Sequence, residues 1–388
     1  MNDNYFDEAM TYGSMRRALK RCCRGIRWKD SVVGYELHAA QHTHELLNAI
    51  RAGTYKISPY QHFTIYEPKK REIVATRIVD RQVQMALCKG GWYEDITEHF
   101  IYDNCACQTG KGTDFALKRL KVHMLQYYRE HGKEGWALKC DIHHFFPSTR
   151  HDVAKAAVAK RTRDPKAAQM VFQIIDSFGG DRGIGLGSQI SQLVELAVLD
   201  DVDHYIKEHL RIRHYIRYMD DFILIHPDKE YLRECLRHIR WELAKIDLEL
   251  NDKTTMYPLR QGIRFLQWRF LLTDTGGVRM MIGNDKAGRE RRRLKKVMAR
   301  ESAGELMPGT ADNSFTAWKA NAERGNAYYV IRDMKRFYGQ LKGEMQNAHN
   351  AGTDAQSPAR RVAGPVQSEQ QCREYRLYRH DGRHRNSY

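Results

Sequence analysis

The sequence lacks the features that mark secreted and membrane-spanning proteins. No apolar run in its 388 residues approaches the roughly 20 residues of a membrane-spanning helix. Residues 1–8 are acidic and polar, without the basic and then apolar order of a secretory signal. The 8 cysteines do not suggest a disulfide framework, and no further Cys or His pair at zinc spacing accompanies Cys105 and Cys107. We therefore expect a cytoplasmic protein with free thiols and no membrane partner.

Acidic residues are also scarce relative to basic ones. The chain has 64 Lys and Arg against 48 Asp and Glu, which gives a net charge of +16. Such an excess favours a polyanionic partner, with nucleic acid ahead of an anionic membrane. The basic residues cluster, since 8 of the 15 residues in 286–300 are Lys or Arg and the C-terminal end is rich in Arg. This clustering favours nucleic-acid binding over a merely solvated basic surface.

The apolar pattern in the middle of the chain predicts an α+β arrangement. Residues 136–141 fit a buried strand that ends in a carboxylate, and residues 212–225 fit a β-hairpin with Asp220 and Asp221 at its tip. Between and after them, three helical stretches and a short strand are expected at 151–178, 188–210, 229–247 and 248–250. This order is that of the ferredoxin-like, or split βαβ, layout. It predicts that the strand end and the hairpin tip lie side by side.

The carboxylates Asp141, Asp220 and Asp221 suggest phosphoryl-transfer chemistry. Joining a nucleotide to a primer is an in-line displacement at phosphorus, and the negative charge on the attacking and leaving oxygens has to be neutralised. Two divalent ions do this, and Mg²⁺ prefers hard oxygen ligands such as carboxylates. Three clustered carboxylates repel one another without metal, so their convergence predicts bound ions. The alternative for Asp220 and Asp221 alone is a polar hairpin turn, which Asp also favours.

Five segments, in order, resemble the sequence boxes of reverse transcriptases. Tyr218-Met219-Asp220-Asp221 resembles the YxDD box, and residues 141–148 resemble the first catalytic box. Residues 186–192 have the form LGxxxSQ of the box between these two. Residues 248–254 resemble the segment that carries a lysine near the triphosphate. Residues 265–270 resemble the primer-grip box, but with Gln267 in place of glycine. The resemblance covers about residues 60–345. It implies a right-hand polymerase with a ferredoxin-like palm, fingers and a helical thumb.

The resemblance implies roles for the residues around the carboxylates. Asp141, Asp220 and Asp221 would bind two Mg²⁺ ions, or Mn²⁺ in their place, and Ile142 would lend its backbone carbonyl. Lys253 would protonate the leaving pyrophosphate.

The resemblance also implies a site for the incoming deoxynucleoside triphosphate. A basic turn between two β-like runs predicts a fingers hairpin on which Lys69 or Lys70, together with Arg71, contacts the triphosphate; the alternative for the lysines is a solvated turn. Phe146 follows Asp141 by 5 residues, where the family has an aromatic gate against the ribose 2′-OH. Phe145 is the better candidate for a core residue.

Leu186 stands where many reverse transcriptases have Gln. Together with Gly187 and Gln192 it is expected beside the incoming nucleotide, where an aliphatic side chain loses a hydrogen bond and loosens selection. The LGxxxSQ form and the turn at 110–113 resemble the enzymes of diversity-generating retroelements, which copy a template RNA with errors at adenine. Uncharacterised and phage-defence bacterial reverse transcriptases share these features, so both interpretations stay open.

The resemblance further predicts the domain organisation. A helical extension is expected at 1–54, fingers and palm at 55–275, the thumb at 276–345 and a basic, disordered tail at 346–388. Cations at the start of the thumb would bind the backbone of the template–primer duplex. They are Arg289, Arg291, Arg292, Arg293, Lys295 and Lys296.

These features together predict an RNA-directed DNA polymerase that copies a template RNA into cDNA with errors and belongs to a retroelement. Its expected partners are the template RNA, an RNA or DNA primer, deoxynucleoside triphosphates and an accessory protein. An anti-phage defence enzyme is the alternative with the same chemistry. A nucleotide cyclase would lack the thumb, and a non-catalytic RNA-binding or splicing-helper module would not need all three carboxylates.

Overall fold

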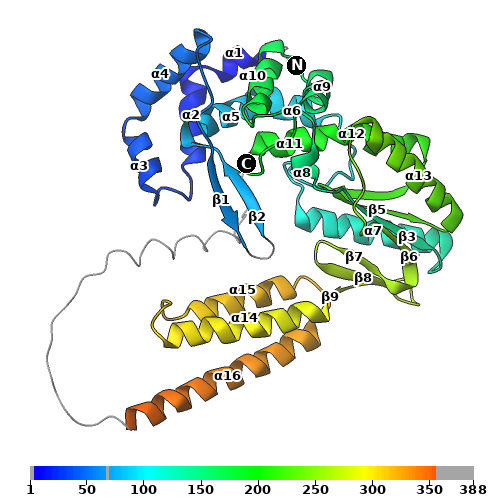
Figure 1. Cartoon of the computed structure of the whole chain (residues 1–388). Helices are drawn as coiled ribbons and strands as arrows, with labels where there is room; N and C mark the ends of the chain where they lie inside the picture. The colour runs from blue at the N-terminus through cyan, green and yellow to red at the C-terminus, as the bar shows by residue number, and fades with distance from the viewer. Residues whose placement is uncertain (1–3, 67–69, 355–388) are drawn as a thin grey trace, which may run out of the picture. The chain divides into compact units, whose positions relative to one another are not determined.

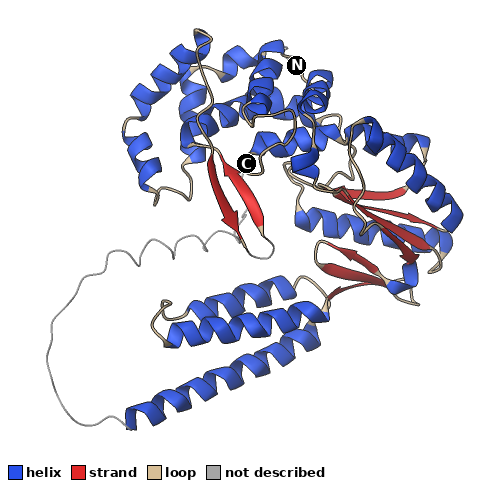
Figure 2. Ribbon diagram, in the orientation of Figure 1, coloured by secondary structure: helices blue, strands red, loops and turns tan. Residues whose placement is uncertain are grey.

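The computed structural model describes residues 4–66 and 70–354, and the chain divides into two compact units (Figure 1). The first unit comprises the chain up to Leu266 together with residues 272–278. The second comprises residues 267–271 and the chain from Arg279 onward. Figure 2 shows that helices dominate both units and that the strands of the described residues form three small sheets. None of the described helices is long and apolar enough to span a membrane.

The predicted N-terminal extension is helical and packs within the first unit. Its helices are α1 (Tyr5–Ala9), α2 (Tyr12–Cys22), α3 (Asp30–Leu37) and α4 (Ala39–Arg51). Thr11 caps α2, since its side chain accepts a hydrogen bond from the Ser14 amide. The apolar face of α2 is buried against α4 and α5 (Ile78–Leu87). There Gln82 Nε2 of α5 donates to the Met15 carbonyl of α2 at 3.1 Å and to Thr43 Oγ1 of α4 at 3.0 Å, which joins α5 to both helices.

The predicted fingers hairpin is present as β1 (Gln61–Ile65) and β2 (Arg71–Ala75), an antiparallel pair. Further helices follow the hairpin in the sequence. They are η1 (Cys88–Trp92), α6 (Tyr93–Thr97), α7 (Thr113–His131), α8 (Phe145–Ser148), α9 (His151–Arg161), α10 (Pro165–Asp176), α11 (Gln189–Val198), α12 (Asp200–His204) and η2 (Tyr205–His209). Among them, α9 packs against both α10 and α11.

The prediction of a single helix at 151–178 is wrong, because the structure has two helices there, α9 and α10. Asp164 caps α10 by accepting hydrogen bonds from the amides of Lys166 and Ala167. Pro165 occupies the first turn of α10, where its missing N–H costs nothing. The pair Asp164-Pro165 therefore starts a new helix instead of extending the old one.

The predicted ferredoxin-like palm is confirmed by a four-stranded antiparallel sheet. Its strands are β3 (Trp136–Asp141), β4 (His214–Tyr218), β5 (Asp221–His226) and β6 (Thr255–Pro258), in the spatial order β4-β5-β3-β6. Helix α13 (Lys229–Lys245) packs on β3 and β5, and α7 packs on β4. Strands β4 and β5 are buried on both faces along most of their length, so the sheet forms part of the main hydrophobic core.

The fourth palm strand lies later in the chain than predicted. Instead of 248–250 it is β6, and Leu250 forms only an isolated bridge with Ile142. The reason is the turn between them, in which the Lys253 amide donates to Asn251 Oδ1 and the Thr254 amide donates to the Asn251 carbonyl. Asn favours such side-chain-stabilised turns, and here the turn ends one extended segment and starts the next.

The second unit contains a three-helix bundle. Its helices are α14 (Asn284–Ser302), α15 (Thr310–Ala322) and α16 (Tyr328–Asp354). The strands β7 (Ile263–Phe265), β8 (Trp268–Leu272) and β9 (Val278–Ile282) form a small sheet in that order. The bundle core contains Leu294, Met298, Met334 and Tyr338. Helix α16 continues past the predicted thumb boundary at 345, because no proline interrupts the sequence before Pro358. The rest of the predicted tail, 355–388, lies outside the described residues.

Candidate active site

Adjacent palm strands bring the three carboxylates together. Asp141 ends β3 and lies directly opposite Asp221, the first residue of β5. Asp220 occupies the turn between β4 and β5, and its carbonyl accepts a hydrogen bond from the Ile142 amide at 3.3 Å. The Asp141 carbonyl in turn accepts from the Asn251 amide at 2.7 Å. The backbone on both sides of the catalytic candidates is therefore fixed by hydrogen bonds.

The turn that carries Asp220 is held by a buried ion pair. Met219 adopts a left-handed φ of 56°, an uncommon conformation for a residue other than glycine. Arg217 Nη1 donates to the Met219 carbonyl at 3.0 Å, and its Nη2 donates to Asp203 Oδ2 at 2.6 Å. Tyr215 also donates to Asp203, at 2.5 Å. Arg217 and Asp203 are almost fully buried, so this network positions the turn from inside the core.

The pKa values of two of the carboxyl groups are raised, as expected where acids lie close together at a cation site. Burial, followed by the charge of Asp141, raises the pKa of Asp220 to about 6. Burial also raises the pKa of Asp221, although Lys139 opposes this shift. Lys139 Nζ lies 2.7 Å from Asp221 Oδ2. Lys139 precedes Asp141 by two residues on β3, so the two side chains share one face of the strand.

The donor set fits a hard divalent cation, although no preformed cage is present. In residues 4–66 and 70–354, no three His, Cys, Asp or Glu side chains are arranged so as to hold a metal ion. Asp221 Oδ1, however, is buried and has no hydrogen-bond partner among the described residues, while Oδ2 is engaged by Lys139. An unpaired buried carboxylate oxygen is costly unless a cation neutralises it. Oxygen-only donors are those that Mg²⁺ prefers.

The segment around Leu186 and Gly187 contacts the fingers hairpin. The Val74 amide of β2 donates to the Leu186 carbonyl at 3.0 Å. Gly187 has a φ of 152°, and a Cβ there would lie 2.6 Å from the Val74 carbonyl oxygen. Only glycine permits so close an approach of two backbones. Leu186 is half-buried beside this junction, between the hairpin and the start of α11.

Gln192 connects α11 to the catalytic turn through a cysteine. Cys107 Sγ donates to Gln192 Oε1 at 3.3 Å and lies 3.7 Å from Met219 Sδ. Upstream, the side chain of Ser188 caps α11 by accepting from the Ser191 amide at 3.0 Å. Gln192 is thus placed beside the turn that carries Asp220.

The two phenylalanines after Asp141 have different environments. Phe145 is buried in the main core, as predicted, whereas Phe146 is only half-buried. The Phe146 carbonyl accepts from the Ile184 amide at 2.9 Å, which ties α8 to the segment before Leu186. Phe146 is therefore available for contact with a substrate in a way that Phe145 is not.

The predicted triphosphate contacts are exposed cations. Lys70 and Arg71 are exposed at the start of β2, and Lys69 lies outside the described residues. Lys253 is exposed in the turn that follows the Asn251 contact with Asp141. The structure brings the turn backbone of Lys253 near Asp141 but gives no side-chain contact between Lys253 and the carboxylates.

The predicted nucleic-acid contacts line one side of α14 in the second unit. Arg289, Arg291, Arg292, Arg293, Lys295 and Lys296 are all exposed, while Leu294 and Met298 face the bundle core. Arg291 and Lys295 lie over the Phe337 ring, 5.5 Å and 5.8 Å from its centroid. A weak ion pair of 3.8 Å joins Arg293 to Glu290. Most of the cationic charge on this helix is therefore presented to solvent.

Several residues that support the carboxylates were not predicted from the sequence. Lys139 had a usable signal, since alternation along β3 places it on the face of Asp141. Asp203 and Arg217 had none, because their pairing joins α12 to β4 across the fold. Glu195 of α11 is also buried; it accepts a hydrogen bond from Thr149 Oγ1 at 2.8 Å, and its burial raises its pKa well above the usual value. A glutamate on a helical apolar face gives no sequence signal of this kind.

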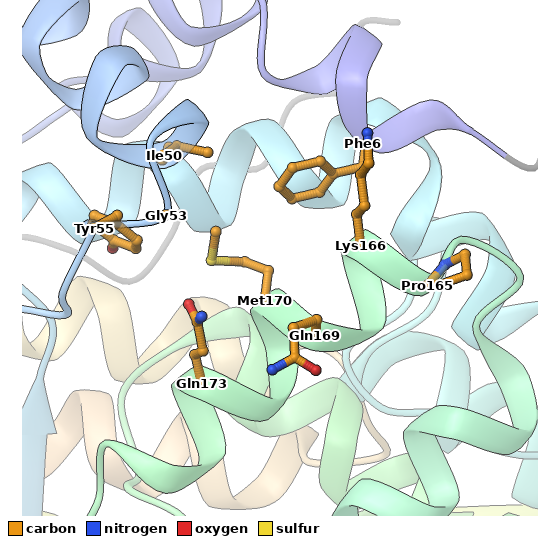
Figure 3. Close-up of a pocket in the computed structure, with 9 residues that line it drawn as sticks. All are labelled: Phe6, Ile50, Gly53, Tyr55, Pro165, Lys166, Gln169, Met170 and Gln173. Atoms are coloured by element: carbon orange, nitrogen blue, oxygen red, sulfur yellow. The ribbon is translucent and has the colours of Figure 1, made fainter.

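A separate pocket of about 360 Å³ lies away from the carboxylates (Figure 3). It is bounded by α1, α4 and α10, and Phe6, Ile50, Tyr55 and Met170 form its apolar lining. None of the predicted site residues lines it, so it is not the candidate active site.

Comparison with known protein families identifies the region that holds the carboxylates. Residues 67–270, more than half of the 388 residues, match the family model described as reverse transcriptase (RNA-dependent DNA polymerase). Asp141, Asp220 and Asp221 all fall within this match. No curated protein matches the sequence.

Solved polymerase structures are similar to parts of the chain. They include apo telomerase from Candida tropicalis truncated from the C-terminal domain (12% identity, TM-score 0.45, 62% of this chain and 60% of that one). A telomerase from Candida albicans in complex with a fragment of telomeric RNA has 11% identity and a TM-score of 0.45, over 80% of this chain and 59% of that one. The Sicinivirus RNA-dependent RNA polymerase has 13% identity and a TM-score of 0.48, over 76% and 66%. The chain thus spans less than two thirds of each of these proteins.

Proposed function

We propose, because the chain belongs to the reverse transcriptase family, that it is an RNA-directed DNA polymerase. It extends a primer with deoxynucleoside triphosphates along a template RNA. The observation that carries this proposal is the register of β3 and β5, which sets Asp141 opposite Asp221 with Asp220 in the adjoining turn. Partly buried carboxylates that converge in this way serve phosphoryl transfer.

Asp141, Asp220 and Asp221 would hold two divalent ions, Mg²⁺ or Mn²⁺, with help from the Ile142 carbonyl. When bound, such ions neutralise the charge on the attacking and leaving oxygens. The chain's own part is to keep the carboxylates in place. The Arg217–Asp203 pair fixes the turn, and Lys139 forms an ion pair with Asp221 that partly neutralises its charge.

The incoming nucleotide would lie between the fingers hairpin and the carboxylates. Lys70 and Arg71 are exposed cations suited to a triphosphate, and Lys253 is the proposed proton donor for pyrophosphate. The half-buried ring of Phe146 would exclude a ribose 2′-OH. Leu186, Gly187 and Gln192 would border the base and sugar, because Gly187 approaches β2 and Gln192 approaches the turn residue Met219 through Cys107.

The template–primer duplex would bind to the exposed cations of α14, which have few acidic neighbours. A reducing compartment such as the cytoplasm suits the chain, since its seven described cysteines are free thiols. We also propose that the protein uses an RNA or DNA primer and acts with an accessory protein.

Primer extension tests the proposed activity. The purified protein is mixed with a labelled DNA primer, an RNA template, the four deoxynucleotides and a titration of Mg²⁺ or Mn²⁺, with and without cell extract to supply an accessory protein. The expected result is extension that requires the divalent ion and stops when it is chelated. A protein that binds the template but never extends the primer would instead be a non-catalytic RNA-binding module.

The finer proposal is that synthesis is error-prone, as in a diversity-generating retroelement. It rests on Leu186, whose side chain offers no hydrogen bond to the incoming nucleotide. Leu186→Gln would add a polar contact worth roughly 1 kcal/mol, so errors should fall several-fold. Sequencing of cDNA made in vitro measures this, with the largest change expected opposite template adenine. Low and uniform error rates in the unaltered protein would favour an anti-phage defence role.

A further inference from the structure

The solvent-facing side of α2 carries only positive charge. Arg16, Arg17, Lys20, Arg21 and Arg24 are all exposed on or just after this helix. They lie opposite its apolar face, which is buried. Residues 9–29 contain 7 Lys and Arg and no Asp or Glu. Solvated helices commonly mix charges of both signs, so a face without any acid is costly unless an anion binds to it.

One neighbouring cation extends the basic face, and one acid, Glu36, lies at its edge near Arg16 and Arg27. Arg81 of α5 is exposed next to α2, and its carbonyl accepts a hydrogen bond from Cys22 Sγ at 3.3 Å. Near the end of the face, Arg27 pairs with Glu36 at 2.8 Å. Among the described residues no ion pair engages Lys20, Arg21 or Arg24, and Arg17 donates only to Ser14 Oγ, at 2.9 Å.

The chemistry of this face favours a phosphate backbone over a membrane. An amphipathic helix that binds lipid needs a free apolar face, whereas the apolar face of α2 is committed to α4 and α5. Four of the five cations are Arg, whose planar guanidinium binds phosphate through paired hydrogen bonds. Arg17 and Arg21 lie about one turn apart on α2, and Arg24 follows just beyond its C-terminal end, so the three extend along one direction instead of meeting at a point. A line of this kind suits an extended polyanion.

We propose that this face of α2 is a second nucleic-acid site, which binds the backbone of template RNA outside the segment being copied. The proposal rests on the proposed function for the identity of the RNA, but the binding itself does not need polymerisation. Helix α2 lies with α3 and α4 at one end of the first unit, and the palm sheet lies at the other (Figure 1). It also precedes the region that matches the reverse transcriptase family, residues 67–270. Flanking RNA held there would keep a long template on the enzyme.

Helix α13 provides a matched control on the same unit. Arg233, Arg237 and Arg240 are exposed and have the same spacing as Arg17, Arg21 and Arg24. Their helix face is of mixed sign, because Glu230 and Glu234 lie among them and Glu230 pairs with Arg233 at 2.5 Å. A triple Arg→Gln change removes the same charge from either helix, and Gln has a helix propensity close to that of Arg.

The experiment compares Arg17→Gln/Arg21→Gln/Arg24→Gln with Arg233→Gln/Arg237→Gln/Arg240→Gln. Binding to a labelled RNA hairpin is measured as a function of salt, alongside a DNA hairpin and phosphatidylserine vesicles. We expect the α2 variant to bind RNA more weakly and to have a salt slope shallower by up to roughly three units, whereas the α13 variant behaves like the unaltered protein. An α2 variant with three Lys in place of Arg should recover most of the slope. Equal melting temperatures check folding.

Three outcomes would overturn the proposal. One is RNA binding by the α2 variant with the salt slope of the α13 variant. Another is loss of vesicle binding with RNA binding intact, which would make the face a membrane contact. The third is loss of DNA-hairpin binding alone, which would exclude the template RNA. Primer extension is scored separately on a short template, so failure of polymerisation in the unaltered protein would contradict the proposed function and leave this binding result standing.

Discussion

Burial and the charge of Asp141 raise the pKa of Asp220 to about 6, and this shift has a consequence for activity. A carboxylate binds a cation only when it is ionised, so Asp220 is competent above pH 6 and protonated below it. We expect the rate of primer extension at low Mg²⁺ to fall about tenfold per pH unit below pH 6. Raising Mg²⁺ should move the inflection to lower pH, because the ion and the proton compete. An inflection pH that does not change with the Mg²⁺ concentration would contradict this competition.

The Arg217–Asp203 pair should matter for both stability and activity. Removing one partner of a buried pair leaves an uncompensated charge, so Arg217→Met should destabilise the protein by about 3–5 kcal/mol. Arg217→Met/Asp203→Asn should recover part of that loss, because no net charge is left buried. Activity should not recover, since the Met219 carbonyl still lacks its donor. Urea unfolding gives the first quantity, and the Mg²⁺ concentration for half-maximal extension gives the second. Recovery of both together would reduce the pair to a purely structural role.

Phe146 provides a test of sugar selection. Phe146→Ala should open space for a ribose 2′-OH and raise incorporation of ribonucleotides relative to deoxynucleotides. Phe145→Ala is the matched comparison, and it should mainly destabilise the core, by about 3–5 kcal/mol, since Phe145 is buried. Competition assays with paired ribo- and deoxynucleotides measure the ratio. An unchanged ratio in the Phe146 variant would place the gate elsewhere.

At the residue scale, local patterns predicted the carboxylates but not their supports. Asp141 and Asp220 stand at strand ends, where alternation and turn chemistry make them visible in the sequence. Lys139 was open to the same reasoning. Asp203 and Glu195 were not, because a buried acid on a helix is explained only by a partner from another element, Arg217 or Thr149. The assigned roles of the site residues stay predictions until such variants are measured.

At the scale of elements, the periodic segments were predicted well and the breaks between them poorly. The helical stretch predicted at 229–247 is α13, and the strand predicted at 136–141 is β3. The predicted helix at 151–178 failed at Asp164-Pro165, and the predicted strand at 248–250 gave way to β6 after the Asn251 turn. Both failures came from capping and turn residues that override a favourable apolar pattern.

Helix α14 should act through binding and not through chemistry. Changing Arg291, Arg292 and Arg293 to Gln should weaken template–primer binding at every sequence and flatten the salt slope by up to about three units. The rate of a single turnover from the preformed complex should change little. Filter binding across a salt series, with the α13 triple variant as control, measures the effect. An unaltered slope would show that these arginines serve only as solvated surface charge.

At the scale of the whole molecule, the family match and the palm topology point to the same chemistry. The predicted α+β right-hand polymerase class is confirmed by the sheet order β4-β5-β3-β6 and by the match over residues 67–270. The catalytic candidates belong to the first unit and the basic helix α14 to the second. The sequence predicted both, since the carboxylate boxes and the run of cations are local features. It did not predict that α16 would continue to Asp354, past the expected end of the thumb.

The central claim is that Asp220 is part of a metal-dependent polymerase centre, and one comparison tests it most directly. Asp220→Asn and, as a control, the exposed Asp252→Asn are assayed for Mg²⁺-dependent extension of a DNA primer on an RNA template, and their melting temperatures are measured. The raised pKa of Asp220 means that its ionisation reduces stability as pH rises from about 4 to 6. At pH 7 without metal, the Asn variant should therefore melt at the same temperature as the unaltered protein or higher. We predict that it is folded and inactive while Asp252→Asn extends normally; a folded Asp220→Asn protein that extends the primer at the unaltered rate would contradict the account.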